Sequence, residues 1–108
     1  MIRTYLTFEV AEGKADALVS LFQEGLILET SAAQEGCHSA ELTISQDGLQ
    51  AIATAVWDDL AAYERWTSRS DRAGHAEDIN ALLSSPIGAE TVGGKFTIAH
   101  SVQSADQA

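Results

Sequence analysis

The 108-residue sequence has few basic residues, one cysteine and one proline. Its 6 Lys and Arg residues stand against 16 Asp and Glu residues, which gives a formal net charge of −10. Because such a surface repels phosphate backbones and no run of Lys or Arg offsets it, we expect no nucleic-acid partner. Cys37 is the only cysteine, so an intrachain disulfide is excluded, which favours a reducing compartment.

Long hydrophobic runs are also missing. The N-terminal residues lack an apolar core of signal-peptide length, and the longest apolar runs are far too short to span a bilayer. We therefore expect a cytoplasmic protein with no membrane partner. The composition, 45% hydrophobic and 20% charged, is that of an ordinary globular protein, and the length suits one domain. We expect this domain over residues 1–102, followed by a polar tail over 103–108.

Hydrophobic periodicity predicts alternating strands and helices in the first half of the chain. Apolar residues recur at every second position for most of Ile2 to Val10, which indicates a strand with one apolar face. Apolar residues at helical spacing predict one long helix over 14–33, and Gly36 is a typical stop. Two further strands are expected over 39–45 and 49–57, joined by a turn with an Asp-Gly hairpin signal.

The second half of the chain begins with paired carboxylates that are typical of a helix start. Asp58 or Asp59 can accept hydrogen bonds from the free backbone N–H groups of a first helical turn. The helical region is expected to break near 68–70, to restart with Asp71 in its first turn, and to continue toward Leu83. Proline disfavours helix in the residue before it, so Pro86 ends this region.

A last strand, over 95–102, completes the order β-α-β-β-α-β. This order is the ferredoxin-like topology, an α+β fold whose four-stranded antiparallel sheet carries both helices on one face. The other face has enough apolar or small side chains that water covers it poorly. A second copy of the chain is the natural cover, and a domain of this size gains from the extra burial, so we expect a homodimer.

The segment from Val56 to Trp66 reads Val-Trp-Asp-Asp-Leu-Ala-Ala-Tyr-Glu-Arg-Trp. It resembles the strand-to-helix passage of the antibiotic biosynthesis monooxygenase family, in which a Trp ends the third strand and an aromatic residue follows six residues later. The turns at 12–14 and 35–37 resemble the family's first turn and its Pro-Gly-Cys or Pro-Gly-Phe turn. The similarity covers about Ile2 to Val102. It implies a dimeric α+β barrel, with one pocket per subunit between sheet and helices.

One branch of this family consists of cofactor-independent oxygenases that convert aromatic phenols or anthrones to quinones. Trp57 and Tyr63 match the spacing of the Trp and Tyr in their sites, so the resemblance implies that these two residues are catalytic. Their rings can form stacking walls, and the indole N–H and phenol O–H can serve as donors in a dry pocket. Small side chains at 51, 53 and 55 share the strand face of Trp57 and leave room for a planar ligand. We expect a monooxygenase without a cofactor that oxidises a small, flat aromatic substrate.

Further residues are expected to bind this substrate, namely Tyr5, Thr7, Trp66 and His75. Enzymes of the oxygenase branch often place an Asn near the site, whereas the only Asn of this chain is Asn80, in the late helix. If a donor on the first strand replaces it, the candidates are Tyr5, Thr7 and Arg3.

Two other functions remain open. In the haem-degrading branch a Trp is followed by an axial His, and Trp66 and His75 resemble that pair at a spacing one residue shorter. A His on an apolar helical stripe is equally typical of a pocket wall or core, and Trp57 and Trp66 could likewise be plain core residues. A non-catalytic dimer that binds a small ligand would need only the pocket.

No metal site is expected. His38 and His100 fall on separate strands, and the sequence shows no third ligand at a spacing typical of zinc or iron. The adjacent carboxylates Asp58 and Asp59 are explained by helix capping. The sequence also lacks a Walker-type loop, a dinucleotide fingerprint and a Gly-x-Ser-x-Gly elbow, which fits an enzyme that uses no nucleotide or flavin.

Overall fold

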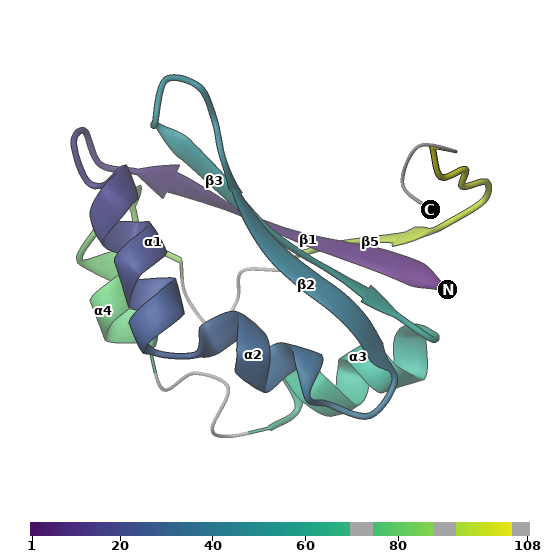
Figure 1. The fold of residues 1–108 in the computed structure, drawn as a ribbon. Helices are drawn as coiled ribbons and strands as arrows, with labels where there is room; N and C mark the ends of the chain where they lie inside the picture. The colour runs from purple at the N-terminus through teal and green to yellow at the C-terminus, as the bar shows by residue number, and fades with distance from the viewer. Residues whose placement is uncertain (70–74, 88–92, 105–108) are drawn as a thin grey trace.

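The computed structural model describes residues 1–69, 75–87 and 93–104. Helices cover one face of an antiparallel sheet, with α1 and α4 at one end, α3 at the other end and α2 between them (Figure 1). The elements, in chain order, are β1 (Ile2–Val10), α1 (Ala15–Glu24), α2 (Ile27–Ala32), β2 (Cys37–Ile44), β3 (Gln50–Trp57), α3 (Leu60–Thr67), α4 (Ala76–Asn80), β4 (Leu83–Ser85) and β5 (Gly94–Thr97).

The sheet has the strand order β2-β3-β1-β4, and β5 also pairs with β1. β1 and β3 pair along their whole length, from Ile2 opposite Trp57 to Glu9 opposite Gln50. β4 and β5 are both short and pair with opposite ends of β1, so together they occupy one position in the sheet. The predicted α+β, ferredoxin-like class is confirmed, with the last position of the sheet divided between two strands.

The predicted single helix over 14–33 is instead two helices, with a break at Gly25 and Leu26. Leu26 has a φ of 52°, which is the left-handed conformation that ends a right-handed helix. The Gly25 N–H still donates to the Leu21 carbonyl, 2.9 Å away, and closes α1. Glycine is a weak helix former, whereas the apolar spacing continues through the break, so periodicity alone does not reveal it.

The late helix is shorter than predicted, and Leu83 lies in a strand instead of a helix. α4 ends at Asn80, and the side chain of this residue bonds to the backbone that follows β4. Its amide nitrogen donates to the Ile87 carbonyl at 2.8 Å, and its oxygen accepts from the Ile87 N–H at 2.9 Å. The expected restart at Asp71 lies outside the described residues. The last strand ends at Thr97, because its partner β1 begins at Ile2, opposite Thr97.

The helix-covered face of the sheet holds two hydrophobic clusters. The α1 end consists of Phe8, Val10, Leu18, Phe22, Ala51 and Ile79. The α3 end consists of Ala55, Trp57 and Ala62, with Tyr63 and Trp66 packed against them. In the part of the chain that the structure describes, no helix is long and apolar enough to cross a membrane.

Candidate functional site

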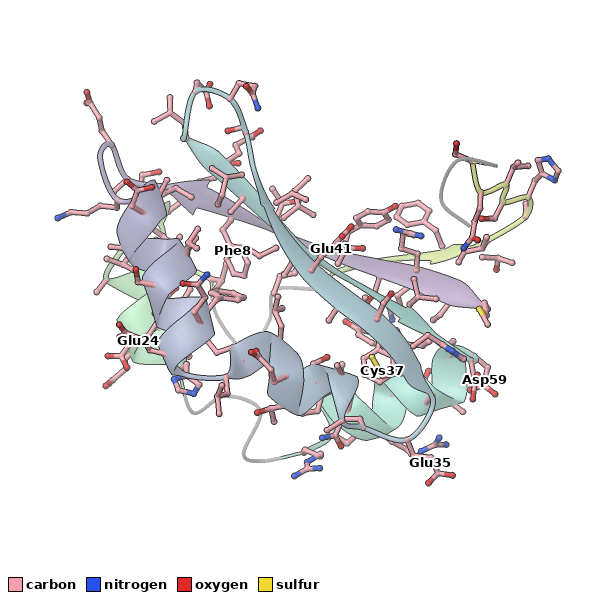
Figure 2. The ribbon with its side chains drawn as sticks, viewed as in Figure 1. Phe8, Glu24, Glu35, Cys37, Glu41 and Asp59 are labelled. Carbon is pink, nitrogen blue, oxygen red and sulfur yellow. The ribbon has the colours of Figure 1, made fainter. Side chains whose placement is uncertain are left out.

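A cavity of about 470 Å³ lies between the sheet and the helices, where the two clusters meet. Its volume falls within the roughly 300–1,000 Å³ that is usual for small-molecule sites. β3 turns Ala53 and Ala55 toward the helices, and Ala40 of β2 lies opposite Ala55 in the ladder. Because these side chains are small, the sheet leaves space between itself and the helices at this point. Phe8 points from β1 toward the helices and closes the cavity on the side of α1 (Figure 2).

Aromatic side chains from β3 and α3 form one wall of the cavity. The rings of Trp57 and Tyr63 meet edge to face, with centroids 5.7 Å apart. Trp57 is only 1% exposed, and its indole N–H donates to the Thr4 hydroxyl oxygen, 3.3 Å away. Trp57 therefore offers a ring wall, because its donor is already engaged. The Tyr63 hydroxyl has no hydrogen-bond partner among the described residues, so it can donate to a ligand.

Trp66 extends the aromatic wall toward the C-terminal end of α2. It is half-buried, and the Arg69 guanidinium lies 5.9 Å from its ring centroid, within cation–π range. The same guanidinium donates to the Gln34 side-chain oxygen at 2.6 Å. The contact links the chain after α3 to the chain after α2, the two helices that border this side of the cavity.

His75 lies at the opposite side of the cavity, at the N-cap position of α4. Its ring packs against the turn between α1 and α2, so close to Gly25 that a Cβ there would lie 2.9 Å from the His75 Cε1 atom. Ser31 of α2 adds a hydroxyl group to the lining. The described lining is thus mostly apolar, and its polar groups are a phenol, an imidazole, the Asn80 carboxamide and a few hydroxyls.

The structure places Trp57, Tyr63, Trp66 and His75 around one cavity. It does not bring Thr7 to the cavity, since Thr7 is exposed on the other face of β1. Tyr5 borders the cavity, but its ring belongs to that other face and contacts Phe96, with centroids 5.6 Å apart.

Sequence reasoning missed the Asn80 carboxamide and three hydroxyl residues of the lining, namely Thr4, Ser31 and Thr54. Thr4 shares the apolar face of the first strand with Leu6 and Phe8, so the period of two could have identified it. Ser31 follows Ile27 and Leu28 at helical spacing, which the same kind of argument would have placed on the cavity side.

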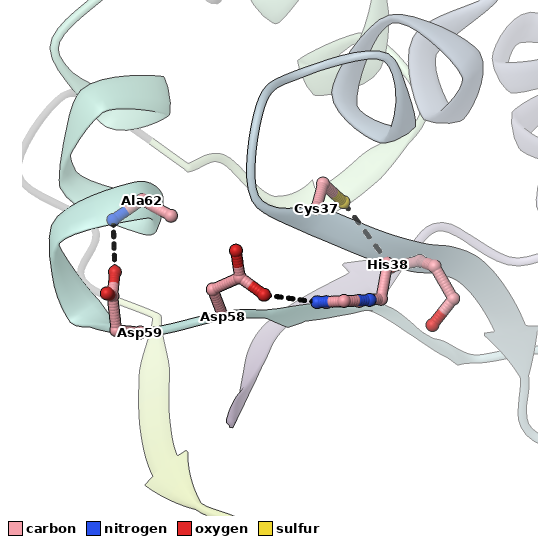
Figure 3. A network of polar contacts seen from close by, with 6 residues as sticks. Cys37, His38, Asp58, Asp59 and Ala62 are labelled. Carbon is pink, nitrogen blue, oxygen red and sulfur yellow. Dashed lines mark hydrogen bonds and ion pairs between the residues drawn. The ribbon is translucent and has the colours of Figure 1, made fainter.

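The side chains of four further residues lie outside the cavity, where β2 begins beside α3, namely Cys37, His38, Asp58 and Asp59 (Figure 3). His38 Nε2 is 2.5 Å from Asp58 Oδ1, on the surface, whereas the Asp59 carboxylate accepts from the Ala62 N–H at 2.9 Å and caps α3. Burial raises the pKa of the Cys37 thiol, and hydrogen bonds to Ser39 and Ser31 offset this only in part. A raised pKa keeps the thiol protonated and makes it a poor nucleophile.

His100 is exposed beyond β5 and does not border the cavity. Among residues 1–69, 75–87 and 93–104, no three His, Cys, Asp or Glu side chains are placed to hold a metal ion.

Solved structures of similar fold span nearly the whole chain. A monooxygenase from the ActVA-Orf6 gene of Streptomyces coelicolor, in complex with nanaomycin D, is 22% identical, with a TM-score of 0.77 over 96% of this chain and 92% of that one. A mutant of SnoaB, a cofactor-independent oxygenase from Streptomyces nogalater, is 24% identical, with a TM-score of 0.74 over 95% and 97%. Rv0793 from Mycobacterium tuberculosis is 16% identical, with a TM-score of 0.72 over 94% and 98%. At these identities the likeness shows the fold.

Comparison with curated protein sequences finds no significant match. The sequence profile of a family described as antibiotic biosynthesis monooxygenase, however, matches residues 1–79. That match covers most of the chain, including β1, β3 and α3, which carry much of the cavity wall. The chain belongs to the antibiotic biosynthesis monooxygenase family.

Proposed function

We propose that this protein is a cofactor-independent monooxygenase that oxidises a flat aromatic phenol or anthrone with O2. The observation that carries the proposal is the cavity of about 470 Å³, with alanines on its sheet side and the Trp57, Tyr63 and Trp66 rings on its wall. Such a site can hold a planar polycycle by stacking and can exclude water from it.

The chemistry needs only the substrate and O2. An anthrone loses one proton and becomes an extended enolate, which gives one electron to O2. The resulting radical pair recombines to a peroxide at carbon, and the peroxide loses water to leave the quinone. One oxygen atom of O2 enters the substrate and the other leaves as water, with two hydrogen atoms removed from the substrate carbon.

The side chains that line the cavity have different roles in this reaction. The Tyr63 hydroxyl, which is free to donate, stabilises the oxyanion that forms when the substrate ionises. His75 supplies an imidazole nitrogen, which can accept the substrate proton. Trp57 and Trp66 position the rings. Thr7 and the Tyr5 ring have no part in this site, because they belong to the opposite face of the sheet.

The relatives support this assignment by their activities. SnoaB is described as a cofactor-independent oxygenase, and the Streptomyces coelicolor monooxygenase binds nanaomycin D in its solved structure. Both share the fold of this chain over more than nine-tenths of its length. Family membership favours oxygenation, whereas the choice of a flat aromatic substrate depends on the shape and the lining of the cavity.

The test is aerobic incubation with an anthrone, followed by quinone absorbance and O2 uptake. We expect wild type to form quinone with one O2 consumed per substrate. Tyr63→Phe should lower kcat by about 10²-fold, the usual effect of removing one oxyanion donor. Ala53→Leu, which fills the cavity from β3, should abolish turnover without unfolding the protein. Equal O2 uptake with and without wild-type protein, across several anthrones and polycyclic phenols, would contradict the proposal.

Haem binding through His75 is the competing outcome. It predicts that titration with hemin shifts the Soret band and that His75→Ala abolishes the shift. A non-catalytic ligand-binding protein would bind polycyclic phenols without consuming O2. The three functions are therefore separated by the same two measurements, a binding spectrum and an O2 trace.

We also propose that the protein works as a homodimer. The described helices all cover one face of the sheet, whereas the other carries Tyr5, Ile52, Val56 and Phe96, the last of which is 59% exposed. A second copy packed on this face would bury these side chains.

Size-exclusion chromatography with light scattering should give twice the chain mass, and the interface should bury more than roughly 1,200 Å². Phe96→Glu should produce monomers, whereas Leu49→Glu, a matched change of an exposed apolar residue in the β2–β3 turn, should not. A monomer mass for wild type at micromolar concentration would rule out the dimer.

A further inference from the structure

At position 25 there is no room for a Cβ atom, whereas the backbone conformation itself does not require glycine. Its φ of −80° and ψ of −3° are open to any residue. A Cβ at this position, however, would lie 2.9 Å from His75 Cε1, 3.3 Å from His75 Nδ1 and 2.9 Å from the Leu21 carbonyl oxygen. Such contacts are closer than these atoms tolerate, so two neighbours must give way to a side chain here. One is the Leu21 carbonyl in the last turn of α1, and the other, which is the flexible one, is the His75 ring.

A hydrogen bond ties the backbone that carries the His75 ring to α4. The His75 carbonyl accepts from the Ile79 N–H, 2.9 Å away, and Ile79 is buried in the α1 end. The ring has the α1–α2 turn on one side and the cavity on another. A ring that moves from Gly25 toward the cavity takes up part of the cavity space.

Both sides of the same turn also border the cavity. Phe22 precedes Gly25 and Ile27 follows it, and both belong to the cavity lining. The space between the turn and the aromatic wall is therefore set by the position of the His75 ring. A flat ligand that reaches from Trp57 toward the turn meets this ring at its far end.

We propose that Gly25 is a specificity-determining residue: by lacking a side chain it seats the His75 ring against the α1–α2 turn, and so sets the length of flat ligand that the cavity accepts. The ligand class rests on the proposed function. The selection by length does not, because it concerns binding and not oxidation.

The experiment measures the binding of two probes by quenching of tryptophan fluorescence, in the absence of O2 so that neither probe is oxidised. The probes are 1-naphthol, with two fused rings, and 1,8-dihydroxyanthraquinone, with three. Gly25→Ala should weaken binding of the three-ring probe about tenfold and that of the two-ring probe less than about twofold, since overpacking penalises only the ligand that needs the space. Removing the displaced ring in the double variant Gly25→Ala/His75→Ala should restore three-ring binding to the level of His75→Ala alone.

Gly13→Ala is the matched control for a general loss of stability. Gly13 has a φ of 77° and open space around it, so alanine strains the turn without approaching the cavity. Its two probe affinities should keep the wild-type ratio. A selective loss of the three-ring probe in Gly13→Ala would overturn the proposal, because the selectivity would then reflect general loosening.

A crystal structure of Gly25→Ala should show the His75 ring displaced toward the cavity, and an unmoved ring would overturn the inference. So would unchanged affinities in Gly25→Ala, a double variant as weak as the single one, or a wild type that binds neither probe. If Gly25→Ala loses the three-ring probe as described but the wild type forms no quinone from anthrones, the proposed function alone is overturned. Quinone formation with unchanged selectivity in Gly25→Ala overturns this inference alone.

Discussion

The two ends of the helix-covered sheet face differ in the side chains that pack there. The α1 end packs aliphatic side chains and two phenylalanines, Phe8 and Phe22, whose rings meet edge to face with centroids 6.1 Å apart. The α3 end has only Ala55, Trp57 and Ala62 fully buried, and its other aromatics face the cavity. The α1 end has no polar anchor in its buried cluster, whereas Trp57 is held by a hydrogen bond to Thr4. This difference indicates that the α1 end supplies stability and that the α3 end supplies the shape of the site.

The strongest test of this division is Leu18→Ala at the α1 end. Leu18 is fully buried and does not border the cavity. We expect the free energy of unfolding to fall by about 3 kcal/mol, as for other buried leucines, while the folded protein keeps its affinity for 1,8-dihydroxyanthraquinone. Urea denaturation measures the first quantity. A loss below about 1 kcal/mol would show that the α1 end is not the main source of stability.

At the α3 end, Thr4→Val removes the acceptor of the Trp57 indole N–H while keeping the shape of the side chain. An unpaired buried donor should cost about 1–2 kcal/mol. Thr4→Ser keeps the hydroxyl and serves as the control. If the valine variant is as stable as wild type, the hydrogen bond has no role in holding Trp57, and the ring is positioned by packing alone.

The adjacent carboxylates at the start of α3 should differ in effect. Asp59→Ala removes the N-cap and should lower the free energy of unfolding by about 1 kcal/mol. Asp58→Ala breaks only the exposed contact with His38 and should change it by less than about 0.5 kcal/mol. Thermal unfolding of the two variants side by side measures the difference. Equal losses would mean that the His38 contact holds α3 as firmly as its cap.

The smallest effect concerns the thiol beside the α3 end. Because burial raises the pKa of Cys37, the unfolded chain loses this proton at a lower pH than the folded chain. Its contribution to stability is therefore complete below the unfolded pKa and is lost as pH rises through the folded pKa. The urea midpoint of wild type should fall more between pH 7 and alkaline pH than that of Cys37→Ala. Identical pH profiles would contradict the raised pKa.

Local patterns predicted the parts of the fold that depend on neighbours in sequence. The period of two placed β1, and the Asp-Gly signal placed the hairpin that joins β2 to β3. The break at Gly25 and the strand at Leu83 were missed because both depend on distant partners. The His75 ring packs on the first, and Val10 of β1 pairs with the second.

The site was predictable where a resemblance fixed the spacing of aromatics, as for Trp57 and Tyr63. Alternation along the first strand already separated Thr7 from the apolar face, so its assignment to the site conflicted with the same pattern that predicted the strand. The engagement of the Trp57 donor by Thr4 could not be predicted, since it depends on the register between β1 and β3.

The hydrogen bonds between Asn80 and Ile87 have a consequence for the ageing of the protein. The carboxamide offers one donor and one acceptor to the Ile87 backbone, and both are used. Spontaneous deamidation would convert the side chain to a carboxylate, which has no donor, and would set its negative charge against the Ile87 carbonyl. Ile87 borders the cavity, so a change of a single amide group would loosen the wall of the site while leaving the sheet intact. Stored protein should therefore lose ligand binding before it loses its fold.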